Sequence, residues 1–420
     1  MNLSNENRLL LYCAQVEIPQ DILNEVKHLT NSPLNWEEVL EAASWHGITS
    51  LLYHNLKNIR KIPREIMNHL KNAYFGNIVR NLYLYSELNR ILDKFYKNDI
   101  EVIVLKGAAL AKTVYRDIGL RPMADIDLMV RRENLPLIWK LMPELNYGLM
   151  GNKPPEWYIE NHHHLRYKHM EKPILIEIHW HIADKSHPSR IRITDTTIIE
   201  SWWKRSKLLE FEGKKTLILC PEDLLLHLSL HFLKHRFIKG RFTSKSALIQ
   251  LCDIYQTLKH YGDKLDWTGL RSEAEKYKVY ELINLTLCIV RDFWGDNKGI
   301  FGYALKDFSL SSSNYRKQLE LIKSKILLRE DPLFDGFIPL LKADTFQKKL
   351  KVIIRKIFPR SHVLSKKYTV SRSSKKLYLY YFIHPFKLSL KYGKLILRIS
   401  NTKKWTREEV TLNKWINPRG

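Results

Sequence analysis

The fold is decided by two neighbouring stretches, I-E-V-I-V-L at residues 100–105 and A-D-I-D-L-M-V at residues 124–130. The first is a β-branched run of strand length. In the second, Asp125 and Asp127 alternate with apolar residues, as in a half-buried strand. A third stretch, I-L-I-E-I-H-W-H at residues 174–181, alternates in the same way. Together they predict a small sheet that carries acidic side chains on one face.

These acidic side chains are candidates for a metal site. Asp125 and Asp127 share one face of their strand, roughly 6–7 Å apart. Glu177 lies in the third stretch, so three carboxylates converge if the two strands pair. Two like charges at about 6.5 Å repel by roughly 2–3 kcal/mol at an effective dielectric near 20. Mg²⁺ or Mn²⁺ would compensate this repulsion, and two such ions can clamp the attacking and leaving oxygens of a phosphoryl transfer.

A purely structural role for the two aspartates is equally open on spacing alone. A D-x-D pair occurs often by chance. Both side chains can be solvated, or they can pair with one of three nearby cations, which are Arg121, Arg131 and Arg132. The choice therefore depends on the surrounding sequence.

Helical patterns flank the strands on both sides. Apolar residues recur at helical spacing over residues 66–95, and P-E-D at residues 221–223 places acids in the first turn of a later helix. A further short strand pair is predicted at residues 208–211 and 216–219. We predict an α+β fold with a small mixed-sheet core. The predicted regions are a helical N-terminal region at residues 1–98, the catalytic core at 99–219, a helical C-terminal region at 220–300 and a basic extension at 301–420.

Composition excludes several classes of protein. The four cysteines are far apart and form no C-x-x-C pair, which argues against a zinc ribbon or a thioredoxin-type site. The first residues lack the basic and apolar regions of a signal peptide, and no apolar run of about 18 residues exists to span a bilayer. We therefore expect a cytoplasmic protein with reduced thiols and no integral membrane segment.

The net charge of +25 is concentrated near the C-terminus. Between Asp344 and Glu408 there are 18 lysines and arginines and no acidic residue. Aromatic residues are interleaved with these cations, for example in K-K-L-Y-L-Y-Y-F at residues 375–382. Three interpretations are open, which are a solvated helix face packed against the body, a nucleic-acid-binding surface, and contact with an anionic membrane surface.

Several histidines are placed where they can approach the acidic strands. His227, His231 and His235 recur at every fourth position, so they share one helix face. We expect this face to border the active-site cleft, with His231 the representative candidate, although a structural role is equally open. His179 shares the face of Glu177 and is a second candidate. His162-His163-His164 is interpreted as a loop.

Four motifs in order carry a resemblance to a known family. They are L-K-G-A-A-L at residues 105–110, R-P-M-A-D-I-D-L at 121–128, E-I-H-W at 177–180 and P-E-D-L-L-L-H-L at 221–228. This order resembles the DNA polymerase β-like nucleotidyltransferase superfamily. It is more closely similar to a bacterial family described as uncharacterised nucleotidyltransferases, over roughly residues 30–290. Two features differ from the superfamily pattern: Ala108 replaces a second Gly or Ser, and the spacer before Asp125 is longer.

The resemblance implies a role for each matching position. Asp125, Asp127 and Glu177 would hold Mg²⁺ or Mn²⁺ and form the catalytic set, with Glu177 binding a second metal or accepting the proton of the acceptor. The residues implied in nucleotide binding are Lys106, Gly107, Ala108 and Arg121. Gly107 would let the backbone approach the triphosphate at a helix N-terminus. Lys106 and Arg121 would contact phosphate or pair with the acids.

The resulting expectation is a metal-dependent nucleotidyltransferase core between helical regions. It would move a nucleoside monophosphate from a nucleoside triphosphate such as ATP to an acceptor hydroxyl, releasing pyrophosphate. The acceptor is open between a protein or peptide, a small molecule and an RNA end. The alternative is a non-catalytic protein that uses the same fold and the basic extension to bind nucleotide or nucleic acid.

Overall fold

The computed structural model describes residues 3–151, 153–182, 196–211, 213–238, 241–295, 313–327, 345–368, 370 and 374–396. The chain divides into two compact units. The first consists of Met1–Leu328 with Ile416–Gly420, and the second consists of Arg329–Trp415.

A seven-stranded mixed sheet forms the centre of the first unit, with the strand order β3-β4-β5-β2-β1-β7-β6. Its strands are β1 (Ile103–Val104), β2 (Ile126–Met129), β3 (Tyr147–Leu149), β4 (His164–His169), β5 (Leu175–His179), β6 (Lys207–Phe211) and β7 (Lys214–Ile218). The pairs β2–β5 and β1–β7 are parallel, and the other pairs are antiparallel. The predicted α+β class with a mixed-sheet core is confirmed, as is the predicted strand pair, which forms β6 and β7.

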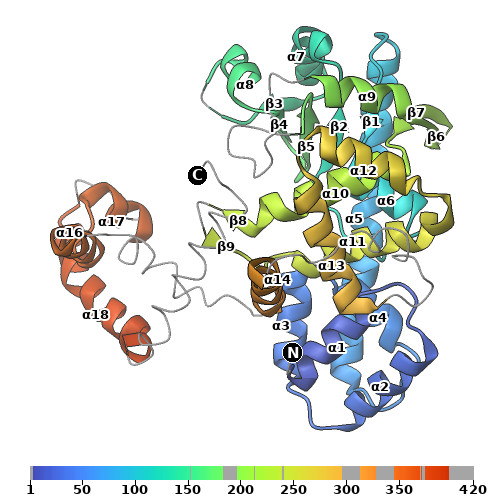
Figure 1. The fold of residues 1–420 in the computed structure, drawn as a ribbon. Coiled ribbons are helices and arrows are strands. Elements are labelled where there is room, and N and C mark those ends of the chain that lie inside the picture. Colours follow the sequence, from blue (N-terminus) through green and yellow to red (C-terminus); the bar gives the residue numbers. More distant parts are fainter. Residues whose placement is uncertain are drawn as a thin grey trace. The chain divides into compact units, whose positions relative to one another are not determined.

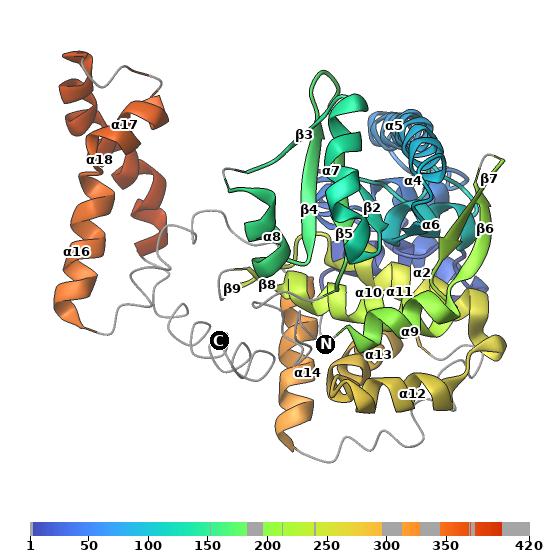
Figure 2. The same ribbon diagram turned by 90° about the horizontal axis from the view of Figure 1, so that it is seen from above.

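The pleat of β2 and β5 separates an apolar face from a polar one. Ile126, Leu128, Ile176 and Ile178 are fully buried in the core. This core is completed by α5 (Arg64–Tyr96) and α7 (Leu135–Glu144). Because side chains alternate along a strand, Asp127 and Glu177 face the other side of the sheet, where α10 (Pro221–Arg236) lies (Figure 2).

The two strands beyond β5 and the helix before β4 are among the elements that were not expected from the sequence. β3 and β4 extend the sheet beyond β5, and α8 (Pro155–Asn161) precedes β4. The interpretation of His162-His163-His164 as a loop is wrong for His164, which begins β4. Only Leu165 and Tyr167 of β4 are apolar and buried, so the local pattern was too polar to indicate a strand that its neighbours stabilise. Conversely, the run at residues 100–105 forms only the short β1.

The N-terminal helices pack onto one end of the unit. They are α1 (Asn5–Cys13), α2 (Gln20–Asn31), α3 (Trp36–His46) and α4 (Thr49–Leu56). Asn35 caps α3, since its side chain accepts a hydrogen bond from the backbone N–H of Glu38. The long helix α5 runs from this end to the sheet (Figure 1). Its first half contacts α4, and its second half contributes to the core under the sheet.

The later helices join the two ends of the unit. They are α6 (Lys106–Thr113), α9 (Thr197–Arg205), α11 (Ala247–Tyr261), α12 (Trp267–Lys276), α13 (Tyr280–Trp294) and α14 (Ser313–Ile326), and a small hairpin of β8 (Phe237–Ile238) and β9 (Arg241–Phe242) follows α10. The Trp45 indole N–H donates to Ser244 Oγ at 3.0 Å. The Trp294 indole N–H donates to the Leu11 carbonyl at 3.0 Å. Residues far apart in sequence therefore share one body.

Within its described residues, the second unit contains three helices that carry much of the basic extension. They are α16 (Phe346–Ile357), α17 (Ser361–Tyr368) and α18 (Lys376–Ile396). Tyr368 stacks on Tyr380 at 4.3 Å between ring centroids, and its hydroxyl lies 2.9 Å from His384 Nδ1. Apolar side chains including Ile354 and Phe382 are exposed on this unit. Among the residues that the structure describes, no helix has the length and apolar character needed to cross a membrane.

Candidate active site

A pocket of about 850 Å³ lies over the polar face of β2 and β5. Its size is within the range of small-molecule sites. Its charged and imidazole lining comes from α5, α6, the strands, α10 and the segment after β9. These residues are Arg80, Lys106, Arg121, Asp125, Asp127, His163, His164, Arg166, Glu177, His179, His231, Lys234, His235 and Lys245.

The sheet register brings the predicted carboxylates together. Asp127 on β2 is the direct partner of Glu177 on the parallel strand β5. Asp125 lies two residues before Asp127 and lines the same pocket. Asp127 is 5% exposed, and its Oδ1 is 2.7 Å from Lys106 Nζ and 2.9 Å from His179 Nε2. The structure therefore joins three carboxylates, one ammonium and one imidazole in a single cluster.

The pKa values of the three carboxyl groups are driven apart by their surroundings. Burial and the charges of Asp127 and Glu177 raise the pKa of Asp125 to about 6. Burial also raises the pKa of Asp127, but Lys106 and His179 outweigh it and hold this pKa well below its usual range. Burial also raises the pKa of Glu177, but the hydrogen bond from His179 together with the charges of His179 and His164 outweighs it and lowers this pKa to about 2. The least compensated negative charge is therefore at Asp125, a setting that favours a bound cation.

The Lys106-Gly107-Ala108 turn opens α6 at the edge of the pocket. Lys106 has a φ of +43°, a left-handed conformation that is strained for a residue with a side chain. Burial lowers the pKa of Lys106, but the charges of Asp127 and Glu177 outweigh it and raise this pKa overall. A Cβ on Gly107 would lie 3.0 Å from Arg121 Nη1, so this glycine lets the loop pack closely on α6. The Ala108 carbonyl accepts a hydrogen bond from the Tyr85 hydroxyl.

Arg121 lines the pocket but is committed to another partner. Its Nη2 and Nε bind the two oxygens of Asp253 on α11 at 2.6 and 3.1 Å. The Tyr115 hydroxyl donates to the same carboxylate at 2.8 Å. Arg131, another predicted partner of the aspartates, lies 3.5 Å from Glu101. Arg121 therefore ties the loop before Asp125 to α11, an arrangement set by a residue 132 positions away.

One face of α5 holds the same loop through side chains that the sequence analysis did not single out. Asn81 Nδ2 donates to the carbonyls of Ile118 and Arg121. Arg80 donates to the carbonyls of Met123 and Ala124, both at 2.9 Å. In the sequence, the one signal for this role is that Arg80 and Asn81 are polar residues within a helical stretch. They position the backbone immediately before Asp125.

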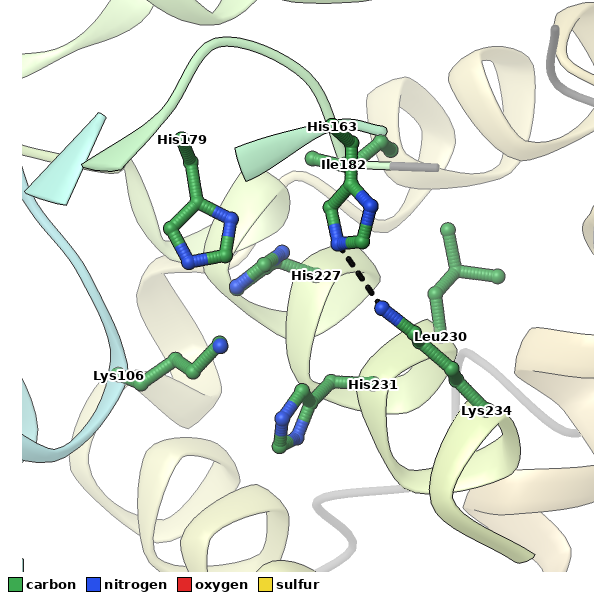
Figure 3. A pocket seen from close by; sticks show the side chains of 8 residues that line it. All are labelled: Lys106, His163, His179, Ile182, His227, Leu230, His231 and Lys234. Atoms are coloured by element: carbon green, nitrogen blue, oxygen red, sulfur yellow. Dashed lines mark hydrogen bonds between the residues drawn. The ribbon is translucent and has the colours of Figure 1, made fainter. Parts of the chain in front are cut away.

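His179 and His231, the two histidines that the sequence analysis singled out, both line the pocket. His235 also lines the pocket, whereas His227 lines a smaller cavity beside it (Figure 3). Burial, followed by the charge of Lys106, lowers the pKa of His231 well below its usual range and that of His235 to about 3. These rings are therefore neutral at neutral pH. Lys234 and Lys245, which no motif indicated, add positive charge to this wall.

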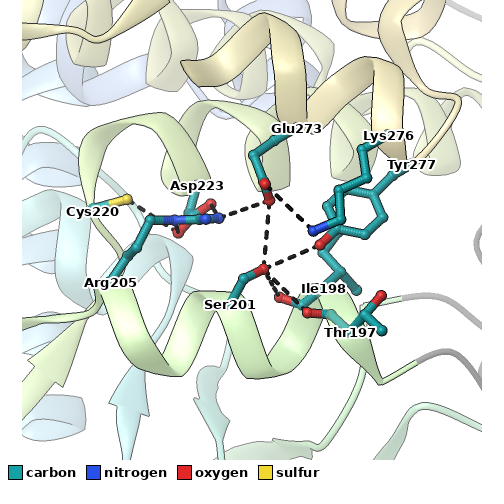
Figure 4. A network of polar contacts seen from close by, with 9 residues as sticks. All are labelled: Thr197, Ile198, Ser201, Arg205, Cys220, Asp223, Glu273, Lys276 and Tyr277. Carbon is teal, nitrogen blue, oxygen red and sulfur yellow. Dashed lines mark hydrogen bonds and ion pairs between the residues drawn. The ribbon is translucent and has the colours of Figure 1, made fainter.

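A separate polar network fixes the start of α10 (Figure 4). Arg205 on α9 binds both oxygens of the buried Asp223 at 2.7 and 3.0 Å, and it reaches Glu273 on α12 at 3.0 Å. The Ser201 and Tyr277 hydroxyls lie 3.1 Å apart in the same network. These contacts fasten α10 between α9 and α12, and so they determine where the histidine-bearing face lies.

Comparisons with known proteins identify a matching family. Residues 32–295 match the family described as "Uncharacterised nucleotidyltransferase". No curated protein matches the chain. Among solved structures, the chain is similar to an antigenic nucleotidyltransferase-like protein from Paracoccidioides brasiliensis, at 16% identity over 48% of this chain and 92% of that one, with a TM-score of 0.28. The family match covers more than half of the sequence, and the chain belongs to the uncharacterised nucleotidyltransferase family.

Proposed function

We propose that this protein is a metal-dependent nucleotidyltransferase that transfers a nucleoside monophosphate from a nucleoside triphosphate to an acceptor hydroxyl. The convergence of Asp125, Asp127 and Glu177 in one large pocket carries the proposal. In the reaction, the acceptor oxygen bonds to the α-phosphorus and the bond to the bridging β-oxygen breaks. Pyrophosphate leaves, and the hydroxyl proton passes to a base.

The donor set fits Mg²⁺ or Mn²⁺. Carboxylate oxygens are the ligands that hard divalent cations prefer, and the raised pKa of Asp125 reflects repulsion that a cation relieves. We assign Asp125, Asp127 and Glu177 as the residues that hold the ion. Such an ion supplies charge stabilisation at the phosphoryl oxygens. The low pKa of Glu177 makes it a weak proton acceptor, which favours metal binding over general-base catalysis.

Positive groups around the pocket suit a triphosphate. The N-terminus of α6 presents the positive end of its dipole, and Lys106 lies beside it. We propose Lys234 and Lys245 as phosphate contacts, in place of Arg121, which is held by Asp253. Gly107 and Ala108 would contribute backbone rather than side-chain contacts.

The test measures pyrophosphate release and label transfer with ATP, GTP, CTP and UTP, in the presence of Mg²⁺ and a cell extract that supplies acceptors. We expect the wild-type protein to transfer label and the Asp125→Asn/Asp127→Asn variant to lose the activity. Glu101→Gln is the matched control, because Glu101 is an exposed acid just before β1. Equal transfer by the double variant would overturn the assignment. Nucleotide binding without any transfer would instead support the non-catalytic alternative.

A further inference from the structure

A group of histidines lies beside the carboxylates, and Figure 3 shows four of them, His163, His179, His227 and His231. His163 directly precedes β4, His164 begins it, and His179 ends β5. Next to them is a small cavity of about 20 Å³, which His163 and His179 line together with His227 and His231 of α10. A cavity of this size holds one water or one ion. The proposed nucleotidyl transfer does not use it.

Three of these imidazoles converge as metal ligands do. Ring nitrogens of His163, His164 and His179 all lie within 4.8 Å of one another. His164 Nδ1 and His163 Nε2 are 3.0 Å apart. A tetrahedral ion with metal–nitrogen bonds of about 2.0–2.1 Å requires nitrogen atoms about 3.3 Å apart. The pair at 3.0 Å is already close to this spacing, and any wider pair must approach for the set to close around one ion.

The surroundings prepare at least two of these rings to act as ligands. His179 Nε2 lies 2.9 Å from Asp127 Oδ1, and a proton on Nε2 leaves the lone pair on Nδ1. A carboxylate behind a ligating histidine is the usual support of such sites. Figure 3 shows the other ring nitrogen of His179 on the side of His163. His163 and His179 are 2% and 3% exposed, so water competes little for their nitrogens.

Lys106 and Lys234 both line this cavity; Lys106 is paired with Asp127, and Lys234 must move when a metal binds. Lys234 Nζ is 2.8 Å from His163 Nε2. Lysine carries its charge on a flexible four-carbon stem, so the ammonium can turn toward the larger pocket that it also lines. Lys234 and a metal ion therefore exclude one another at His163.

We propose that His163, His164 and His179 form a binding site for a divalent transition metal of the Zn²⁺ class, adjacent to the carboxylate site. Imidazole ligands select Zn²⁺, Co²⁺ or Ni²⁺ over Mg²⁺. Three protein ligands leave a fourth position for water or substrate, the arrangement of an open rather than a structural zinc site. The ligands of this site are the three histidines, with Asp127 as the supporting group of His179, and the site does not require the proposed transfer reaction.

The test uses the full chain, stripped with a chelator and titrated with Zn²⁺ and with Co²⁺. We expect one tightly bound ion per chain and the visible absorption of Co²⁺ with nitrogen ligands, unaffected by millimolar Mg²⁺. The single variants His163→Asn and His164→Asn should weaken binding by more than the roughly 10–100-fold that supporting groups contribute. His162→Asn is the matched control, because His162 contacts Trp157 and Tyr158 and is outside the cluster. It should bind like the wild type.

Two results would overturn the proposal. One is a wild-type chain that shows no Co²⁺ spectrum and retains no Zn²⁺. The other is binding by His163→Asn and His164→Asn equal to that of His162→Asn, with unchanged circular dichroism confirming that all of them fold. Asp125→Asn separates this proposal from the proposed function, since it should lose nucleotidyl transfer and keep the Co²⁺ spectrum.

Discussion

Replacing Asp125 by Asn should make the metal-free protein more stable. Burial and the neighbouring acids raise the pKa of Asp125 from near 3.8 to about 6, so its ionised form is disfavoured in the folded state. A shift of about 2 units corresponds to about 3 kcal/mol. Because Asp125 is only half-buried, solvent screening reduces the expected gain to about 2 kcal/mol. For a unit of this size, that raises the melting temperature by about 4 °C.

The pH dependence of this effect has a definite sign. The folded-state pKa of Asp125 is higher than its unfolded-state value, so the charge penalty is absent below about pH 4 and complete above about pH 6. Thermal unfolding in a chelator should therefore show wild type and Asp125→Asn converging at acidic pH and separating at neutral pH. Added Mg²⁺ should raise the melting temperature of the wild type and have little effect on the variant.

The control and the refuting result are both measurable in the same assay. Glu101→Gln removes an exposed acid whose carboxylate is 3.5 Å from Arg131, and it should change stability by less than about 0.5 kcal/mol. The reasoning fails if Asp125→Asn melts at or below the wild-type temperature at neutral pH in chelator. That outcome would mean that Asp125 is already compensated within the folded protein.

Two further predictions concern the surroundings of the site, and a third concerns the basic extension. Arg205→Met leaves the buried Asp223 without its bidentate partner and should lower the free energy of unfolding by about 2 kcal/mol. This value is at the low end for such pairs because Arg205 is partly exposed. Denaturant unfolding measures the change. Asn81→Ala removes two hydrogen bonds to the loop at residues 118–121 and should reduce kcat about 10-fold or more. Circular dichroism should show little change in the fold. An unchanged kcat would show that the loop does not need these hydrogen bonds. If the basic extension binds RNA through six phosphate contacts, the logarithm of the binding constant should fall with the logarithm of the salt concentration with a slope of about −5. If it contacts a membrane surface, it should bind anionic vesicles instead. Binding to neither supports the interpretation as a solvated helix face.

Strand periodicity made much of the candidate site predictable. Asp127 and Glu177 lie on the polar face of their strands because the pleat repeats every two residues, and Asp125, directly before β2, lines the same pocket. The parallel register of β2 and β5 then places Glu177 beside Asp127. The polar strand β4 was missed because its own residues do not specify a strand, and its pairing with β3 and β5 does.

The sequence by itself therefore determined the α+β class and the face that carries the acids, since both depend on spacings of a few residues. Only the tertiary structure assigned partners to the cations and imidazoles. It paired Lys106 with Asp127, Arg121 with Asp253 on α11, and His163 with Lys234 on α10. The last two contacts form only when α10 and α11 take their places in the fold. Local periodicity contains no information about which distant element will supply a partner.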